Sequence, residues 1–308
     1  TIYGGRMTIA NTSPRPPVQV GQPKAGLVFF GLAFLIVIAS PQLPTSLLLP
    51  PDGMVLPMAD WINAAFVFTQ EDLGLTVITR AFASFVAWLL DIFGNLLAGG
   101  RGGLGVPALP WTVLMITGFT LGYGLRDWKL GALAGGTCVW LAVFGQWKWA
   151  METLSLIFVA APLSVSLGFL LGWAAWRYIW FEKILQPIIN VAQSLPHFAY
   201  LIPVVVFFGV GDHAGAIATI IFATPPMVRM TLLGLRRVPS EIIESGHMSG
   251  ATRWQVMRYV RVPTARAEIL IGVNQVIMLC FAMVVIASFI GAPGLGYKLL
   301  QYLQGLKI

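Results

Sequence analysis

The chain has 308 residues, of which 57% are hydrophobic and only 10% are charged, and its formal net charge is +7. Soluble proteins usually carry about 25% charged residues, so this composition excludes a soluble enzyme, a disordered chain and a disulfide-rich secreted scaffold. A polytopic membrane protein remains, in which basic residues flank the cytoplasmic ends of the helices. The two cysteines, Cys138 and Cys280, lie inside apolar runs and predict neither a disulfide nor a metal site.

The N-terminal part predicts a tail followed by one membrane span. Residues 1–25 are expected to form a cytoplasmic tail, and residues 26–49 a first transmembrane segment with a break at Ser40-Pro41. A cleaved signal peptide is the alternative, because Lys24 precedes the apolar run and Val37-Ile38-Ala39 resembles a cleavage site.

Residues 50–110 are expected to form an extracytoplasmic or interfacial scaffold region. Within it, residues 59–98 predict an amphipathic helix rather than a span. Apolar side chains recur at spacings of three and four on one face, namely Ile78, Phe82, Phe85, Leu89, Phe93 and Leu96, while Arg80, Ser84, Asp91 and Asn95 lie on the other. A charge at the bilayer centre costs about 2.5–3.5 kcal/mol, so we expect this helix to lie in the membrane interface and to brace the bundle.

The rest of the chain predicts an all-α transmembrane domain over residues 111–308. Its apolar runs cover residues 111–125, 130–145, 152–180 (containing Pro162), 198–210, 214–235 and 269–290. If the N-terminus is cytoplasmic and the spans alternate, fourteen of the 19 lysines and arginines fall inside, as the positive-inside rule requires.

Several motifs are absent or misleading. Residues 100–105 match G-x-G-x-x-G, but no strand precedes them, so a dinucleotide site is rejected. The sequence contains no Walker A motif and no catalytic constellation, so this chain is expected to be neither an ATPase nor an enzyme. The three histidines lack metal-ligand spacing, and no metal or cofactor is expected to bind this chain. We see no internal repeat in the sequence, which argues against a secondary transporter built from inverted repeats.

The loop at residues 236–266 is long and too polar to insert. Ser240 is expected to cap a short helix through Ser245, and Gly246 and Gly250 follow. Thr252 and Gln255 form a capping box for a second helix, which is expected to run to about Arg261 and to stop at Pro263. The apolar side chains of this loop are Trp254, Val256 and Met257, and its charged ones include Arg253 and Arg258. A solvated basic loop is the alternative, but the order of caps, helices and glycines favours a docking surface for a partner.

The same loop resembles the "EAA" loop of ABC-importer permeases. Glu244-Ser245-Gly246-x-x-x-Gly250, nine residues and Val260-Arg261-Val262-Pro263 are similar to E-A-A-x-x-x-G, nine residues and I-x-L-P. Residues 184–211, 216–235 and 272–296 resemble the glycine betaine/proline betaine permease subfamily. Members of that subfamily have one more span after the position where this chain ends, so we expect the sequence to be part of a longer permease.

The resemblance implies a type I ABC importer permease of the bacterial cytoplasmic (inner) membrane. Two permease copies would line the pathway, two cytoplasmic ATPase subunits would use ATP and Mg, and a periplasmic or lipid-anchored binding protein would deliver the solute; lipid but no nucleic acid is an expected partner. The implied solute is a small zwitterionic or quaternary-amine osmolyte such as glycine betaine or proline betaine. Choline, carnitine, trimethylamine N-oxide, histidine and taurine are alternatives, as is a channel or signalling protein without an ATPase.

Specific residues are expected to serve these roles. The ATPase-coupling residues would be Glu244, Ser245, Gly246, Gly250, Arg253, Trp254 and Pro263. Candidate pathway residues are Asn190, Gln193, Asn274, Gln275, Phe281 and Met283, with helix–helix hydrogen bonds and core packing as the alternative. Asp212, in a short outer loop, is a candidate contact for the binding protein. Gly168-x-x-x-Gly172 predicts close helix packing.

Overall fold

A computed structural model describes residues 75–99 and 108–305, with short pieces at residues 28–31, 34, 35, 38, 60, 61, 64 and 68. The chain divides into two compact units, Thr1–Phe66 and Val67–Ile308, and most described residues belong to the second. The expected N-terminal tail, the break at Ser40-Pro41, the signal-peptide alternative and the glycine run at residues 100–105 lie outside the described residues, and only a few residues of the expected first span are described.

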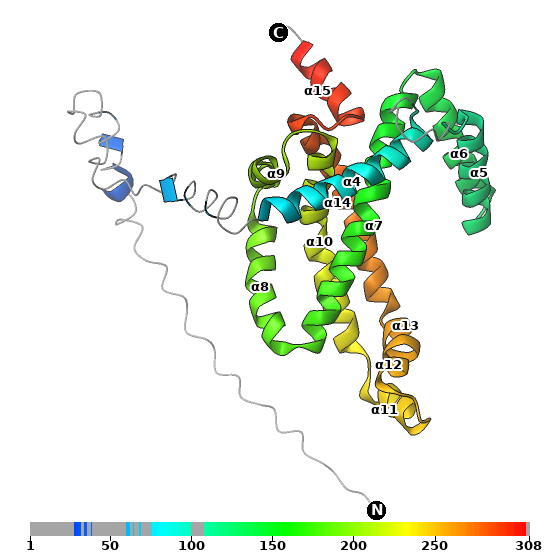
Figure 1. Ribbon diagram of the computed structural model, residues 1–308, viewed down its shortest axis with the longest axis vertical. Coiled ribbons are helices and arrows are strands. Elements are labelled where there is room, and N and C mark those ends of the chain that lie inside the picture. Colours follow the sequence, from blue (N-terminus) through cyan, green and yellow to red (C-terminus); the bar gives the residue numbers. More distant parts are fainter. Residues whose placement is uncertain are drawn as a thin grey trace, which may run out of the picture. The chain divides into compact units, whose positions relative to one another are not determined.

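The second unit is helical and contains no strand within its described residues, which confirms the all-α expectation. Its longer helices are α4 (Leu75–Leu97), α5 (Trp111–Leu125), α6 (Trp128–Val143), α7 (Trp147–Arg177), α8 (Ile179–Ser194), α9 (Leu201–Phe208), α10 (Asp212–Arg237), α11 (Ser240–Met248), α14 (Arg266–Ala287) and α15 (Leu295–Gly305) (Figure 1). Its short ones are η4 (His197–Tyr200), α12 (Arg253–Val256), the π-helical η5 (Met257–Arg261), α13 (Val262–Thr264) and η6 (Ser288–Ile290).

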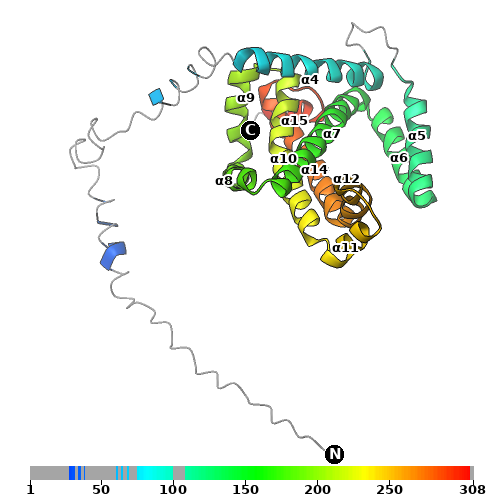
Figure 2. The same ribbon diagram turned by 60° about the horizontal axis from the view of Figure 1, so that its bottom comes forward.

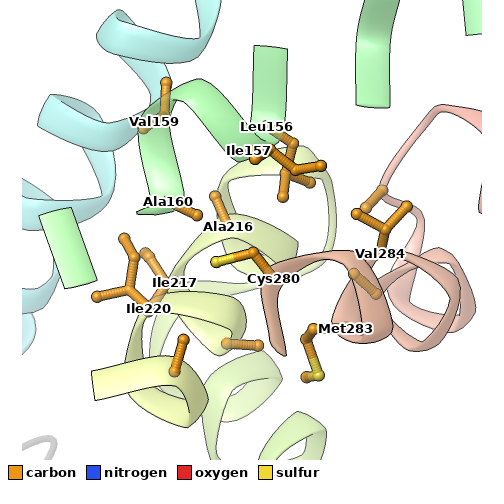
Figure 3. Close-up of a cluster of buried hydrophobic side chains, with 14 of the residues drawn as sticks. Leu156, Ile157, Val159, Ala160, Ala216, Ile217, Ile220, Cys280, Met283 and Val284 are labelled. Atoms are coloured by element: carbon orange, nitrogen blue, oxygen red, sulfur yellow. The ribbon is translucent and has the colours of Figure 1, made fainter. Parts of the chain in front are cut away.

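Helix α10 is the centre of the bundle and packs against both α7 and α14. Small and branched apolar side chains from these three helices interlock in one core, in which Ala216, Ile217 and Cys280 are fully buried (Figure 3). Helices α7, α10 and α14 with η6 are each long and apolar enough to cross a membrane. The polytopic expectation is therefore confirmed.

Close contact between α7 and α10 depends on two glycines. A Cβ atom added at Gly168 would lie 2.6 Å from the Met227 Cβ, and one at Gly172 would lie 2.7 Å from the Thr231 Cβ and 2.8 Å from the Val228 carbonyl oxygen. Any side chain at these positions would force the helices apart. The prediction of close packing at this glycine pair is confirmed.

Helix α4 runs across the bundle rather than along it (Figures 1 and 2). It packs on α7, α9 and α10, which agrees with a bracing helix, although its length and composition would also allow a span. The face that it buries differs from the predicted one. Val86 and Leu90 are buried, whereas Phe82 and Phe85 are exposed, and Asn95, expected on the polar side, is buried. The apolar stripe is wide, so periodicity alone did not show which part of it contacts the bundle.

Several predicted boundaries require correction. Helix α7 begins at Trp147 and ends at Arg177, because Tyr178 has extended backbone angles. No span covers residues 198–210: α9 has only eight residues, and the unpredicted helix α8 precedes it. Helix α8 passes through Pro187, since one proline removes one helical hydrogen bond without necessarily ending the helix.

Helices α5 and α6 form an antiparallel pair of 15 and 16 residues. At 1.5 Å per residue each is about 23 Å long, which is shorter than the hydrocarbon core of about 30 Å. The bounds of α5 match the predicted residues 111–125, and α6 begins two residues before the predicted residue 130.

Candidate functional site

The 236–266 loop forms a compact helical structure at one end of the bundle (Figure 1). Helix α11 leads into a turn at Gly250, whose φ is +78° and whose N–H donates to the His247 carbonyl at 2.9 Å. Residues with a Cβ rarely adopt such a φ. The prediction of a glycine turn between two short helices is therefore confirmed.

The capping box is also confirmed. The Thr252 hydroxyl accepts a hydrogen bond from the Gln255 N–H at 3.3 Å, and the Gln255 Oε1 accepts one from the Thr252 N–H at 2.7 Å. Two other expectations about this loop are wrong. Pro239, not Ser240, occupies the N-cap of α11, and that helix runs to Met248. Pro263 does not stop the second helix, because it lies in the first turn of α13, where a proline needs no helical donor.

The loop has its own small core, which divides its side chains into two groups. Met257 packs with Leu235, Val238 and Ala265, and Val256 is also buried, so these side chains do not form the expected outer surface. Glu244, Ser245, Arg253 and Pro263 are exposed, and Trp254 and Met248 are 63% and 89% exposed. These exposed side chains are therefore the ones that a partner could contact.

Gly246 lies where a side chain would crowd the loop. A Cβ atom at this position would lie 3.3 Å from the Val260 Cγ2 and 3.4 Å from the Val256 Cγ2. Helix α11 can therefore lie close against the following helical segment.

Charged and aromatic groups hold the base of the loop in place. Arg236 and Arg237 belong to the last turn of α10, where the loop begins. Arg236 pairs with Glu182 of α8, and the Arg237 Nη1 lies 3.6 Å from the Glu268 Oε1 of α14. Arg261 lies over the ring of Trp176, near the end of α7. Desolvation by burial lowers the pKa of the Arg261 guanidinium from its ordinary value. The side chain stays cationic at neutral pH because arginine starts from a very high pKa.

A second feature is a polar cavity of about 470 Å³ on the side of the bundle. It is lined by Gln193 of α8, by Pro226, Arg229 and Met230 of α10, and by Asn274, Gln275, Met278 and Leu279 of α14. Three of the candidate pathway residues therefore meet at one cavity. Asn190, a fourth, adjoins it, since its Oδ1 accepts a hydrogen bond from the Arg229 Nη2 at 2.6 Å.

Arg229 is not among the candidate pathway residues of the sequence analysis, although it lines the same cavity. It lies within α10, about 12 Å along the helix axis from Arg237 at 1.5 Å per residue. Among the described residues it forms no ion pair. The signal was present, because an ionisable residue inside a predicted span marks a functional position by default.

The other candidate residues lie elsewhere. Met283 is completely buried in the central core (Figure 3), which agrees with the packing alternative. Phe281 is 53% exposed and does not line the polar cavity. Asp212 begins α10 at the end opposite the 236–266 loop, where its Oδ1 accepts from the His213 N–H at 2.8 Å. Within the described part of the chain, no group of three or more potential metal ligands occurs.

The family of the chain follows from comparison with known proteins. Residues 164–308 match the family described as binding-protein-dependent transport system inner membrane component. A glycine betaine/carnitine transport permease protein of Listeria monocytogenes is 35% identical over 80% of this chain and 85% of its own length. A glycine betaine/proline betaine transport system permease protein of Escherichia coli is 34% identical over 82% of this chain and 67% of its own.

Higher identity occurs with longer proteins. A trimethylamine N-oxide transport system permease protein of Ruegeria pomeroyi is 47% identical over 92% of this chain, but over only 43% of its own length. A protein of the same description from Pelagibacter ubique is 45% identical over 82% of this chain and 37% of its own. The chain thus spans less than half of these two relatives. Together with the apolar helices of the bundle, these matches show that the chain belongs to the binding-protein-dependent transport system inner membrane components, a family of ABC-importer permeases, and is a multi-pass protein of the bacterial inner membrane.

Proposed function

We propose that this chain is the permease subunit of an ATP-driven importer for a small zwitterion that combines a methylated ammonium group with an anionic oxygen. The observation that carries the proposal is the 236–266 loop, a helical projection that Arg261 connects to α7 and α10 and whose Met257 packs against Leu235 of α10. A structure attached in this way can pass a displacement from a docked partner to the bundle. An ATPase that closes on nucleotide would provide that displacement.

The residues proposed to couple the permease to the ATPase have different roles. The exposed Glu244 and Ser245 would contact a groove on a cytoplasmic ATPase subunit, whereas Arg253 and Trp254, which face α7, would support this contact from the side of the bundle. Gly246 and Gly250 set the shape that enters the groove, the first by close packing and the second by its φ of +78°. Pro263 lies in the first turn of the short helix α13, which leads back to α14. ATP and Mg would bind the ATPase, and each of two permease copies would offer one loop.

The polar cavity supports a pathway along this face of the chain. Amide side chains and a guanidinium that faced lipid tails would lose their hydrogen bonds to water, which costs several kcal/mol per charged group. The face with Gln193, Arg229, Asn274 and Gln275 is open in the single chain. A second permease copy across this face would enclose the groups in a water-filled passage.

Arg229 supports a solute that carries an anionic oxygen. A guanidinium without a carboxylate partner attracts an anionic oxygen and repels a purely cationic solute such as choline. Glycine betaine has a carboxylate and trimethylamine N-oxide has a charged oxygen, and both occur in the names of relatives. No second charged side chain lines the cavity in the described part of the chain. Binding in the passage is therefore weak, and a separate binding protein, docking near Asp212, would supply the affinity.

Reconstitution tests the proposal. The permease, its ATPase and its binding protein are placed in proteoliposomes, and uptake of labelled trimethylamine N-oxide, glycine betaine and choline is measured with ATP or with a non-hydrolysable analogue. We expect uptake of one or both zwitterions only with ATP and the loaded binding protein, and no uptake of choline. Solute flux that needs neither ATP nor the binding protein would show a channel instead.

A further inference from the structure

We propose that an anionic phospholipid binds between the 236–266 loop and α7, with its phosphate in one cavity and an acyl chain in an adjoining one. Nothing in the transport proposal requires this site. It follows from two neighbouring cavities of opposite chemical character.

The first cavity, of about 470 Å³, is basic and aromatic. It is lined by Trp173, Trp176 and Arg177 of α7 and by His247, Arg253, Trp254, Val256, Met257 and Arg261 of the loop. Three of these side chains are guanidiniums, and no acidic side chain is among the described residues that line it. The cavity therefore favours an anion, and guanidiniums suit phosphate because they donate two parallel hydrogen bonds.

The second cavity, of about 200 Å³, is almost entirely apolar. It is lined by Phe169, Leu170, Trp173, Trp254, Met257, Arg258 and Val262. Trp173, Trp254 and Met257 line both cavities, so the two spaces adjoin. An apolar space of this kind accommodates a hydrocarbon chain, whereas a soluble phosphate ester would leave it empty.

The order of the cavities along α7 matches the orientation of a lipid in the cytoplasmic leaflet. Phe169 and Leu170 lie deeper in the helix, Trp173 lies between the cavities, and Arg177 ends the helix. The distance from Phe169 to Arg177 is about 12 Å along the axis at 1.5 Å per residue. Tryptophans are typical of the headgroup level, and basic pockets on the cytoplasmic side select anionic headgroups.

Two other occupants fit less well. A quaternary ammonium would need a free aromatic cage, but the ring of Trp176 already has the Arg261 guanidinium 4.7 Å from its centroid. An acidic segment of the ATPase could neutralise Arg177 and Arg253, but it would not fill the apolar cavity. A lipid satisfies both cavities and would bridge α7 to α12, which would stiffen the loop.

Native mass spectrometry of the full complex tests the site. Complexes are purified in detergent and supplied with phosphatidylglycerol, phosphatidylcholine or glycerol phosphate. The variants are the double substitution Arg177→Gln with Arg253→Gln, the same pair changed to lysine, and the control Arg126→Gln, which alters an exposed arginine outside both cavities. Size-exclusion profiles and ATPase content verify that each variant is folded and assembled.

We expect phosphatidylglycerol to remain bound in preference to phosphatidylcholine. Retention should fall by about fivefold for each arginine removed, while the lysine pair and the Arg126 control should keep most of it. Equal retention of the two lipids, no change in the glutamine pair, or displacement of the lipid by glycerol phosphate would overturn the proposal. Release of the lipid when the ATPase subunits assemble would also overturn it, since the cavities would then belong to the protein interface.

Discussion

The guanidinium of Arg261 lies over the indole ring of Trp176, with 4.7 Å between the guanidinium carbon and the ring centroid. Arg261 belongs to the π-helical turn of the loop, and Trp176 belongs to the last turn of α7. The Arg261 Nη1 also lies 3.5 Å from the Leu235 carbonyl oxygen of α10. One side chain therefore connects the loop to two membrane helices.

Replacing Arg261 with lysine should weaken this connection. Lysine keeps the charge but has no planar group to stack on the ring, and partly desolvated cation–π contacts contribute about 0.5–2 kcal/mol. We expect less ATPase stimulation by loaded binding protein, with the complex still assembled. The control is Arg258→Lys, in the same turn, whose guanidinium lies 5.7 Å from the ring of its neighbour Tyr259. Additive effects of Arg261→Lys and Trp176→Leu on thermal unfolding would show that the two residues are not coupled.

Any side chain at position 250 should weaken the coupling between ATP hydrolysis and solute uptake. Its φ of +78° costs an L-residue about 1–2 kcal/mol, so Gly250→Ala should distort the turn and reduce solute uptake per ATP hydrolysed. Gly250→Pro should be more severe, because it also removes the N–H that donates to His247. Gly136→Ala, at a helical position with nothing within 4 Å of the added Cβ, is the control. Equal uptake in the Gly250→Ala and Gly136→Ala variants would contradict a special role for this turn.

Reversing the charge of Glu244 should impair docking of the ATPase. Glu241 lies on the same helix, is also exposed and provides a matched charge reversal. We expect Glu244→Lys to lower affinity for the ATPase at least tenfold, which is about 1.4 kcal/mol, and Glu241→Lys to have a smaller effect. The measurement is binding of purified ATPase to permease in nanodiscs. Identical losses in the two variants would indicate a general charge effect rather than a motif contact.

Arg229 should determine which solutes pass. We expect Arg229→Gln to abolish most zwitterion uptake with the complex intact, and Arg229→Lys to retain part of it, because lysine keeps the charge but not the fork of donors. Assembly and basal ATPase rate should match wild type, and binding of solute to the separate binding protein should not change. Undiminished uptake in the glutamine variant would remove Arg229 from the pathway.

The 236–266 loop should be cytoplasmic. A cysteine at the exposed Ser249, in a chain whose half-buried Cys138 is replaced by alanine, should react with a membrane-impermeant thiol reagent only after the membrane is opened. A cysteine at Val210, which is 65% exposed at the opposite end of the bundle, should react in intact cells. The reverse pattern would invert the topology.

Local signals in the sequence were enough for many elements. The apolar run at residues 111–125, the capping box at Thr252 and Gln255, and the glycine pair Gly168 and Gly172 all appear in the structure as predicted. Each depends on hydrophobicity, capping chemistry or side-chain size within a few residues. The class of protein followed from composition for the same reason, because transfer into a bilayer depends on side-chain chemistry and not on contacts.

Only the tertiary structure determined how distant residues meet. Arg229 and Asn190 are 39 positions apart, and their hydrogen bond exists because α8 continues through Pro187 and packs beside α10. The polar cavity forms because residues of α8, α10 and α14 come together, and the contact of Arg261 with Trp176 forms because the loop folds back on α7. The buried face of α4 likewise depends on which neighbours it contacts. Such contacts depend on the relative placement of whole helices, and the packing of side chains across all of them sets that placement.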